Sequence, residues 1–443
     1  MFEEMRKYQN DRKFLNLEKR RKNLLALKKT IKENKADILK ALQLDLDKNP
    51  NEGFLTEYLM VMEELNFLIK NFNKLAKPKK VRGSLFNFPS KTYIYKEPYG
   101  LVLIVAPWNY PFNLSMIPFL GALAGGNSVV LKPSKKAPAT SEILKKIVEE
   151  SCPPEIGQVV NGKDGNDLVM KEKFDYIFFT GGLETGRKFY KKAAEDLVPI
   201  TLELGGKSPA LICPDADIKI SAKRIAFGKF LNSGQTCVSV DYAIVHESLV
   251  DDFIKEVQKN IHKFFGADPL KSNNYGKIIG REDFERITNT LKRAGLAYRA
   301  DEKNLKISPL VARVNKESPL MEREIFGPIL PVITYKNISE PIDFINSGKT
   351  PLAFYVFSKD IEAAKELMEK VSFGGGAIND TINHIVGRAP FGGFRESGLG
   401  SYHGIKTFET FIHKKTVLDK ALKFDSPFRY PGADIRVIKK FYK

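Results

Sequence analysis

The sequence predicts an α/β protein built from two parallel-sheet units. Short, continuous apolar runs alternate with helical segments between residues 101 and 194, and the same alternation resumes after residue 242. Uninterrupted apolar runs are typical of strands buried on both faces of a parallel sheet, with helices as the crossovers. A length of 443 residues is enough for two domains with large cores. The first unit is the candidate nucleotide-binding domain.

Helices are expected to precede and to connect the strands of the first unit. Apolar residues recur at three- and four-residue steps over 10–45, and a second helix is expected over 51–75, closed by Pro78. The segment 91–98 alternates apolar and polar residues, which indicates a half-exposed strand. Strands are then expected at 101–106, 128–131, 158–160 and 176–179, with helices at 113–124, 138–150 and 184–194.

The second unit follows the same pattern. Its strands are expected at 242–246, 310–314 and 330–335, and its helices at 249–265 and 361–371. The segment 374–404 is glycine-rich and aperiodic, which indicates a loop that passes close to another group. The segment 408–417 is expected to be a closing strand.

Composition argues against several classes of protein. Three cysteines exclude a disulfide framework and favour a cytoplasmic location, and no Cys/His cluster has the spacing of a metal site. The charged N-terminus and the short apolar runs predict a soluble protein without a signal peptide or transmembrane segment. The net charge is +18, but the lysines are spread over helical faces, so no nucleic-acid partner is expected. Nine Lys and Arg against three Asp make the last thirty residues the most basic stretch, which lacks the long apolar face of a membrane anchor.

The stretch 201–237 carries the candidate chemistry. Glu203 precedes a Gly-Gly pair, where the backbone can turn sharply and approach a ligand, and Cys237 follows the small or polar residues 234–236. A cysteine nucleophile forms a covalent intermediate, and a carboxylate can activate the water that resolves it. Cys152 and Cys213 are interpreted as small buried hydrophobic residues.

Two further segments lie where parallel strands end. A glycine turn at 181–182 stands between an apolar strand and a helix, a place that favours a phosphate, although the GxGxxG fingerprint is absent. Asn109 follows another apolar strand between two prolines, and its amide is suited to donate a hydrogen bond to an oxyanion.

Taken together, these motifs resemble the aldehyde dehydrogenase superfamily from about residue 10 to residue 415, and most of all its class 3 type, which acts on fatty and aromatic aldehydes. The class 3 likeness is carried by 108–112, 228–237, 401–404 and a short N-terminal region. The motifs shared with the superfamily are Pro107–Asn109, Lys132–Ser134, Phe179–Gly186, Glu203–Lys207, Gly234–Cys237, Glu324–Pro328 and Pro390–Gly393.

The resemblance implies NAD(P)-dependent oxidation of an aldehyde to a carboxylic acid. Cys237 would attack the aldehyde to give a thiohemiacetal, with the oxyanion held by its own amide and by the Asn109 side chain. Hydride transfer to the nicotinamide would leave a thioester, and Glu203 would activate the water that hydrolyses it. Glu324 is the next candidate for the base. The implied cofactor-binding residues are Pro107, Trp108, Lys132, Ser134, Lys135, Gly181, Gly182, Gly186, Glu324 and Phe326.

This sequence departs from the family pattern at two cofactor positions. Gly182 stands where the family usually has Ser, which removes one phosphate hydrogen bond. Lys135 stands where NAD-preferring members commonly carry a Glu that binds the adenosine ribose and repels a 2′-phosphate. A cation there attracts the 2′-phosphate of NADP, and the alternative is a solvent-facing lysine without cofactor contact. The expected cofactor is therefore NAD or NADP.

The resemblance also implies a division of the chain. A Rossmann-like cofactor-binding domain would comprise 1–82 and 98–204, and the catalytic domain 205–404. A small β bridging arm, 83–97 and 405–420, would join two copies in a homodimer, and 421–443 would be a basic tail. Tyr110, Phe112, Phe230 and 382–386 are expected near an apolar entrance, which favours medium-chain, long-chain or aromatic aldehydes.

Two alternatives stay open at this point. In a CoA-acylating dehydrogenase, CoA rather than water would resolve the thioester, but such enzymes tend to lack a base at the Glu203 position. The charge of +18 would also permit a nucleic-acid or membrane-surface binder that merely retains the fold. Scattered lysines and the intact set of Cys237, Glu203 and Asn109 argue against it.

Overall fold

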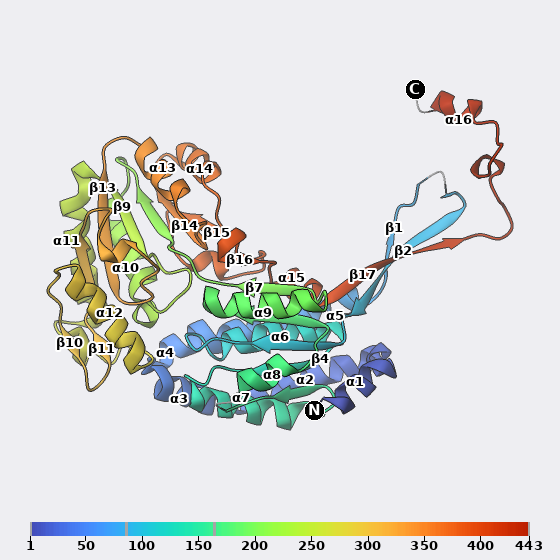
Figure 1. Ribbon diagram of the computed structural model, residues 1–443, viewed down its shortest axis with the longest axis horizontal. Coiled ribbons are helices and arrows are strands. Elements are labelled where there is room, and N and C mark those ends of the chain that lie inside the picture. The colour runs from blue at the N-terminus through green and yellow to red at the C-terminus, as the bar shows by residue number, and fades with distance from the viewer. Residues whose placement is uncertain (1, 85–86, 163–164, 442–443) are drawn as a thin grey trace.

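The computed structural model describes residues 2–84, 87–162 and 165–441. Two six-stranded sheets form the body, and a three-stranded sheet projects from it (Figure 1). Residues 1, 85–86, 163–164 and 442–443, which fall in the predicted cofactor-binding domain, arm and tail, lie outside the described residues.

The first sheet has the strand order β16-β7-β6-β3-β4-β5 and is parallel except for β16. Alternate residues of each strand face opposite layers: α6 and α7 cover one face, and α1, α8 and α9 cover the other. The predicted strands and helices of this unit are present, with α8 and β7 in addition. The bounds are β3 Leu101–Val105, α6 Asn113–Gly125, β4 Ser128–Lys132, α7 Pro138–Ser151, β5 Gly157–Val159, α8 Gly165–Lys171, β6 Tyr176–Thr180, α9 Leu183–Glu195, β7 Ile200–Glu203 and β16 Gly398–Leu399.

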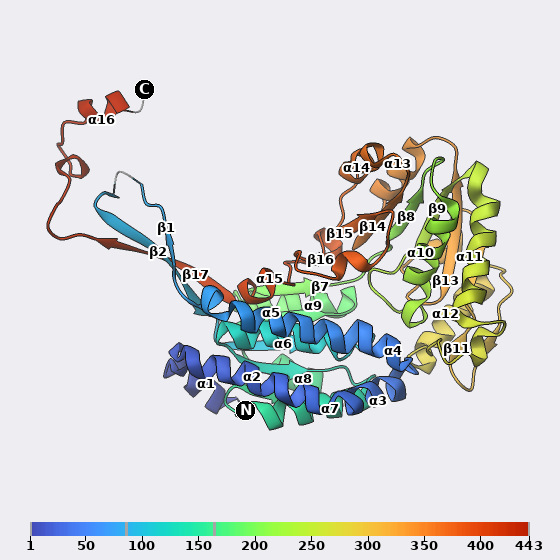
Figure 2. The ribbon, with the colours of Figure 1, turned by 180° about the vertical axis from the view of Figure 1, so that it is seen from behind.

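Apart from α1, the N-terminal helices form a second layer over α6 and α7 (Figure 2). The single helix expected over 10–45 is wrong: the structure has α1 Glu3–Asn10, α2 Leu17–Glu33 and α3 Lys35–Leu46. Asn16 starts α2 by accepting a hydrogen bond from the Lys19 amide, and the chain leaves helical geometry at Asn34. The second predicted helix is nearly continuous, from α4 Pro50–Gly53 through a π-helical turn at Phe54–Tyr58 into α5 Leu59–Ala76.

The second sheet has the order β12-β13-β9-β8-β14-β15 and is entirely parallel. Helices α10 and α11 cover one face, and α13 and α14 cover the other. The segment 374–404 contains the edge strands β15 and β16 as well as loop. The bounds are β8 Pro209–Ile212, α10 Ile218–Phe230, β9 Tyr242–His246, α11 Val250–Phe265, α12 Arg281–Arg293, β10 Ala300–Asp301, β11 Lys306–Ile307, β12 Leu310–Arg313, β13 Ile329–Tyr335, α13 Ser339–Ser347, β14 Ala353–Phe357, α14 Ile361–Glu369 and β15 Gly375–Ile378.

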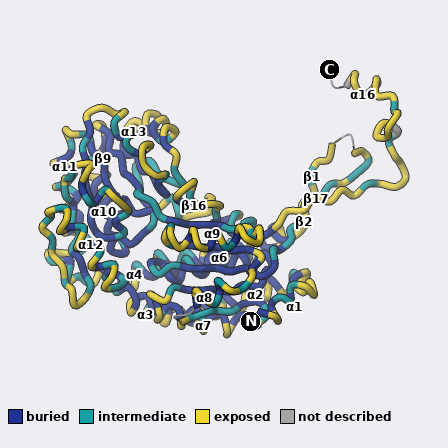
Figure 3. The backbone as a smooth tube through the Cα atoms, in the orientation of Figure 1, coloured by how far each residue is buried: buried dark blue, intermediate teal, exposed yellow. Residues whose placement is uncertain are grey.

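The projecting sheet joins segments from the two ends of the chain. Strand β2 (Ser90–Pro98) lies between β1 (Lys79–Val81) and β17 (Ile412–Lys420), and both pairings are antiparallel. The strand expected over 408–417 therefore starts later, because 405–409 forms α15 (Ile405–Glu409). The projecting sheet and the segment beyond it, which ends in α16 (Arg436–Phe441), have few buried residues compared with the body (Figure 3). Within the described part of the chain, no helix is long and apolar enough to span a bilayer.

Candidate active site

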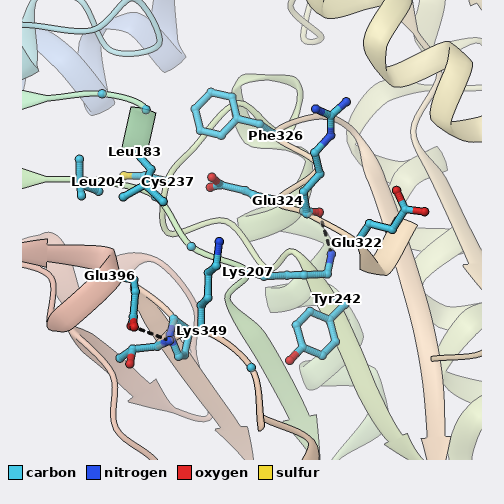
Figure 4. Close-up of a pocket in the computed structure, with 18 of the residues that line it drawn as sticks. Leu183, Leu204, Lys207, Cys237, Tyr242, Glu322, Glu324, Phe326, Lys349 and Glu396 are labelled. Atoms are coloured by element: carbon cyan, nitrogen blue, oxygen red, sulfur yellow. Dashed lines mark hydrogen bonds between the residues drawn. The ribbon is translucent and has the colours of Figure 1, made fainter. Parts of the chain in front are cut away.

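A cavity of about 700 Å³ lies between the two large sheets. Its walls come from the ends of β3, β6 and β7 on one side and from the second unit on the other. Nine of the predicted site residues, from segments far apart in the sequence, line it: Pro107, Trp108, Asn109, Gly181, Gly182, Glu203, Cys237, Glu324 and Phe326. Figure 4 shows the side chains of Cys237, Glu324 and Phe326 around this space. A cavity of this size is typical of a small-molecule or cofactor site.

The loop before Cys237 has an unusual backbone. Asn232, Ser233 and Gly234 all have left-handed φ angles, of 51°, 52° and 75°. A Cβ on Gly234 would lie 2.2 Å from the carbonyl oxygen of Gly327, so only glycine permits this approach. Strained backbone of this kind persists where the surrounding structure holds it. The turn leaves Cys237 partly exposed at the cavity, whereas Cys152 and Cys213 are buried as expected.

Asn109 is tied directly to this loop. Its Nδ2 donates to the carbonyl oxygen of Gln235 at 3.0 Å, and Asn232 Nδ2 donates to the Asn109 carbonyl oxygen at 2.8 Å. The hydroxyls of Tyr110 and Thr236 lie 2.7 Å apart and form a third link. A carboxamide has two N–H donors, so one N–H of Asn109 is left for a ligand.

Glu203 ends β7 and is 3% exposed. In the described part of the structure neither of its carboxyl oxygens has a hydrogen-bond partner, and burial raises the pKa of Glu203 well above its usual range. An unpaired buried carboxyl is costly unless it is neutral. Such a group is typical of a functional site, because a structural carboxyl is normally paired.

A second carboxyl, Glu324, lies beside the Gly-Gly turn. A Cβ on Gly205 would come within 2.3 Å of Glu324 Oε2, which explains why glycine occupies that position. Burial and the nearby Asp241 raise the pKa of Glu324 to about 8. Phe326 makes an edge-to-face contact with Trp108, with ring centroids 5.4 Å apart, across the two walls of the cavity.

Burial and the neighbouring carboxyls of Glu324 and Glu203 raise the pKa of Cys237 to about 12. The resting side chain is therefore a thiol at neutral pH. Each step that needs a thiolate or an ionised Glu203 is favoured by rising pH, because both groups must lose a proton first.

The glycine turn at 181–182 lines the cavity and leads into α9. Gly182 caps α9 without a side-chain hydrogen bond, and a Cβ there would meet no atom within 4 Å. The first amides of the helix therefore face open space, where they favour an anion. Thr180 Oγ1 is buried without a partner at the same strand end.

The remaining predicted cofactor residues do not line this cavity. Lys132 is buried at the end of β4, and burial and the charge of Lys135 lower its pKa. Ser134 is half-buried, Lys135 is exposed, and Gly186 is buried within α9.

Sequence reasoning missed the residues that hold Glu324. Lys207 Nζ donates to Asp241 Oδ2 at 2.6 Å and to the carbonyl oxygens of Leu320 and Arg323 at 2.7 and 3.2 Å. Asp241 Oδ1 accepts from the Ile325 amide at 3.0 Å. The Glu203–Lys207 motif could have pointed to Lys207, because this residue ends the motif. Nothing in the sequence pairs Lys207 with Asp241.

Comparison with known proteins identifies the family of the chain. The model of the aldehyde dehydrogenase family matches residues 1–417. The chain is 41% identical over 433 residues to the 4,4′-diaponeurosporen-aldehyde dehydrogenase of Staphylococcus aureus, covering 96% of this chain and 94% of that protein. It is 38% identical over 435 residues to the dimeric NADP-preferring aldehyde dehydrogenase of Mus musculus, covering 97% and 96%.

Solved structures give the same result. A substrate-bound Staphylococcus aureus AldH superposes with a TM-score of 0.97 at 39% identity, covering all of this chain and 98% of the other. The NADP complex of glyceraldehyde-3-phosphate dehydrogenase GapN from Methanocaldococcus jannaschii gives 0.84 at 27% identity, with coverage of 95% and 93%.

The fold and the comparisons define an α/β oxidoreductase. The chain belongs to the aldehyde dehydrogenase family. The predicted fold class, the resemblance to class 3 members and the NAD(P)-dependent oxidation of aldehydes are confirmed. Neither CoA acylation nor nucleic-acid or membrane-surface binding is favoured.

The raised pKa of Cys237 leads to a labelling test. We expect the rate of alkylation by iodoacetamide to rise about tenfold per pH unit from pH 7 to 9, because the thiolate fraction does so below the pKa. Peptide mass spectrometry after timed labelling measures it. Cys152 and Cys213 should label only after unfolding, which provides the internal control. A rate that levels off below pH 8 would show that Cys237 is a thiolate at neutral pH.

Proposed function

We propose that Cys237 is the nucleophile and that Asn109 and the Cys237 amide hold the oxyanion. The observation that supports this most directly is the hydrogen bond from Asn109 Nδ2 to the Gln235 carbonyl, two residues before the thiol. It sets the amide beside the loop that carries the nucleophile and leaves its second N–H available. Donors fixed in advance stabilise developing negative charge without reorganisation.

Cys237 releases its proton to solvent and its sulfur bonds to the aldehyde carbon, while the electron pair of the carbonyl π bond moves to the oxygen, which takes the negative charge. NAD(P), held by the residues assigned below, would supply the acceptor for the hydride of this carbon. The product on Cys237 is a thioester, which a thiol forms and releases more readily than a hydroxyl would. Glu203 then takes a proton from water, the hydroxide adds to the thioester carbon, and the carbon–sulfur bond breaks to release the acid and Cys237.

Glu203 suits the base role because, among the described residues, neither a cation nor a hydrogen bond holds its ionised form. Burial favours its neutral form, so an ionised Glu203 readily takes a proton from water. Glu324 is the alternative base, since its carboxyl lines the same cavity and its pKa is also raised.

Two variants separate acylation from deacylation. We expect Cys237→Ala to abolish aldehyde oxidation. Glu203→Gln should give a burst of reduced cofactor and then stall, because the thioester cannot be hydrolysed. Stopped-flow absorbance at the wavelength of the reduced nicotinamide measures the burst, and intact-mass spectrometry detects the acylated enzyme. Normal steady turnover of Glu203→Gln would move the base role to Glu324.

The described residues fit NAD(P). The open space at Gly182 and the uncapped start of α9 suit the pyrophosphate, with Gly181 and Gly186 in the same turn and helix. We assign Glu324, Phe326, Pro107 and Trp108 to the nicotinamide end, since they line the cavity around Cys237. Lys132, Ser134 and Lys135 are assigned to the adenosine end, which lies outside that cavity.

We further propose that Lys135 lets the enzyme accept NADP. The side chain is exposed, and no described carboxylate forms an ion pair with it, unlike Lys136, which pairs with Asp283 at 2.7 Å. A cation without such a partner is free to attract a 2′-phosphate. The mouse relative is named NADP-preferring, which agrees with this assignment.

Charge reversal tests the role of Lys135. Lys135→Glu should lower kcat/KM for NADP at least about tenfold, through repulsion of the 2′-phosphate, and leave kcat/KM for NAD nearly unchanged. Steady-state kinetics with both cofactors measure the ratio. Lys145→Glu, on the exposed side of α7, is the matched control. Comparable efficiencies with NAD and NADP that Lys135→Glu does not alter would refute the assignment.

We propose that the substrate is an apolar aldehyde. Tyr110, Phe112 and Phe230 are buried, which leaves Val386, exposed in the segment 382–386, as our candidate for the entrance. The bacterial relative is named for 4,4′-diaponeurosporen-aldehyde, which agrees with a medium-chain, long-chain or aromatic substrate.

A chain-length series tests the substrate class. From propanal to dodecanal we expect kcat/KM to rise, since each buried methylene contributes about 0.8 kcal/mol of transfer free energy. Benzaldehyde should also be oxidised. Reduced-cofactor formation is recorded with NAD and with NADP for each aldehyde. A preference for short or carboxylated aldehydes would overturn the proposal.

The domain division predicted from sequence remains our proposal, with the arm joining two copies in a cytoplasmic homodimer. The projecting sheet supports it, because β17 is an edge strand and Tyr95, Val417 and Leu418 are exposed on the arm. The mouse relative is named dimeric. Exposed edges and apolar residues of this kind are typical of surfaces that another chain covers.

A further inference from the structure

A buried ion pair lies behind the Asn109 segment. Lys48 Nζ and Glu57 Oε1 are 2.7 Å apart, and neither side chain has any exposed area. Removing two charges from water costs several kcal/mol for each ion, and an apolar pair of similar size is often equally stable. A contribution to stability therefore does not by itself explain why the ion pair is present. Its other contacts point to a further role.

Lys48 reaches the backbone of the proposed oxyanion residue. Its ammonium lies 3.3 Å from the carbonyl oxygen of Asn109 and 4.2 Å from the centre of the Tyr110 ring. The same carbonyl oxygen accepts the hydrogen bond from Asn232 Nδ2. One donor thus comes from the N-terminal helical layer and the other from the loop that carries Cys237.

Glu57 holds the other end of the same segment. Its Oε2 accepts hydrogen bonds from the amides of Phe112 and Asn113, at 3.0 and 2.9 Å, where α6 begins. No side chain of the cap residue satisfies these amides, so Glu57 takes the place of a cap. The ion pair therefore clamps 109–113 at both ends, through the Asn109 carbonyl and through the first turn of α6.

The clamp is itself attached to the nucleophile loop and to the second unit. Glu52 Oε1, one turn before Glu57, accepts from the Asn232 amide at 3.0 Å. The Leu46 carbonyl, two residues before Lys48, accepts from the Lys277 amide at 3.0 Å. Movement of Lys48 and Glu57 would thus shift Asn109 relative to Cys237.

We propose that Lys48 and Glu57 are positioning residues that set the Asn109 amide against Cys237 for oxyanion binding. They touch the 109–113 backbone and the Tyr110 ring, so they act through Asn109. The inference rests on the proposed role of Asn109. Errors of about 1 Å in such a group cost about a hundredfold in rate, so a clamp without direct contact to the reacting atoms has a large effect.

Lys48→Met removes the ammonium and keeps the length of the side chain. We expect it to lower kcat/KM for the aldehyde about 10- to 100-fold, with the KM for NAD(P) unchanged. The same loss should appear in cofactor-free acylation of Cys237 by p-nitrophenyl acetate, which uses the oxyanion site but no hydride acceptor. Lys306→Met is the matched control: Lys306 is 8% exposed and pairs with Asp47 at 2.7 Å. It should retain near-normal rates.

The double variant Lys48→Met with Glu57→Gln separates positioning from stability. Because it removes both charges, it should unfold thermally close to wild type even if Lys48→Met alone is too unstable to study. Its kcat/KM should remain low, since the Asn109 carbonyl still lacks the ammonium. Recovery of activity together with stability would overturn the proposal.

A double-mutant cycle with Asn109→Ala tests whether Lys48 acts through Asn109. If Lys48 acts through Asn109, Lys48→Met should cause little further loss of acylation rate in the Asn109→Ala background. Equal losses in both backgrounds would overturn the proposal. If Asn109→Ala is impaired while Lys48→Met matches wild type, only this inference fails. If Asn109→Ala is fully active, the proposed oxyanion role fails first.

Discussion

The hydrogen bonds between Asn109 and the loop 232–237 are the constraint on which the rest of the site depends. They join the end of β3 in the first sheet to the start of the second unit, and so place an amide donor beside a thiol more than a hundred residues away. The left-handed turn at 232–234 and the close contact of Gly234 with Gly327 hold the loop that carries Cys237. Buried strands and helices of the core pack behind both parts.

Burial, more than ion pairing, sets the protonation of the titratable side chains at this site. Glu203 has no described partner, whereas Glu324 is positioned through a backbone segment that Lys207 and Asp241 anchor. Burial keeps carboxyls and thiol neutral at rest and makes each a stronger base once it has ionised. Lys48 and Lys207 donate hydrogen bonds to backbone carbonyls, Lys48 to Asn109 and Lys207 to Leu320 and Arg323.

Much of the fold was predictable because the pattern of neighbouring apolar and polar residues indicates most of its strands and helices. Continuous apolar runs identified β3, β4, β5 and β6, and the helical stretches between them identified α6, α7 and α9. The error at 10–45 arose because the apolar periodicity continues across Asn34, whereas the helical backbone is interrupted there. The α15 turn was missed for the opposite reason, since five residues are too few to show a helical period.

The candidate catalytic groups are visible in the sequence: a cysteine after Gly-Gln-Thr, a glutamate before Gly-Gly and an asparagine between prolines, each a residue type that suits one step of the proposed reaction. The groups that support them become visible only when the chain is folded. Lys48, Glu57, Lys207 and Asp241 are ordinary charged residues in a lysine-rich chain, and nothing local marks them. Their roles come from burial and from partners far along the chain, which only the packed fold brings within hydrogen-bond distance.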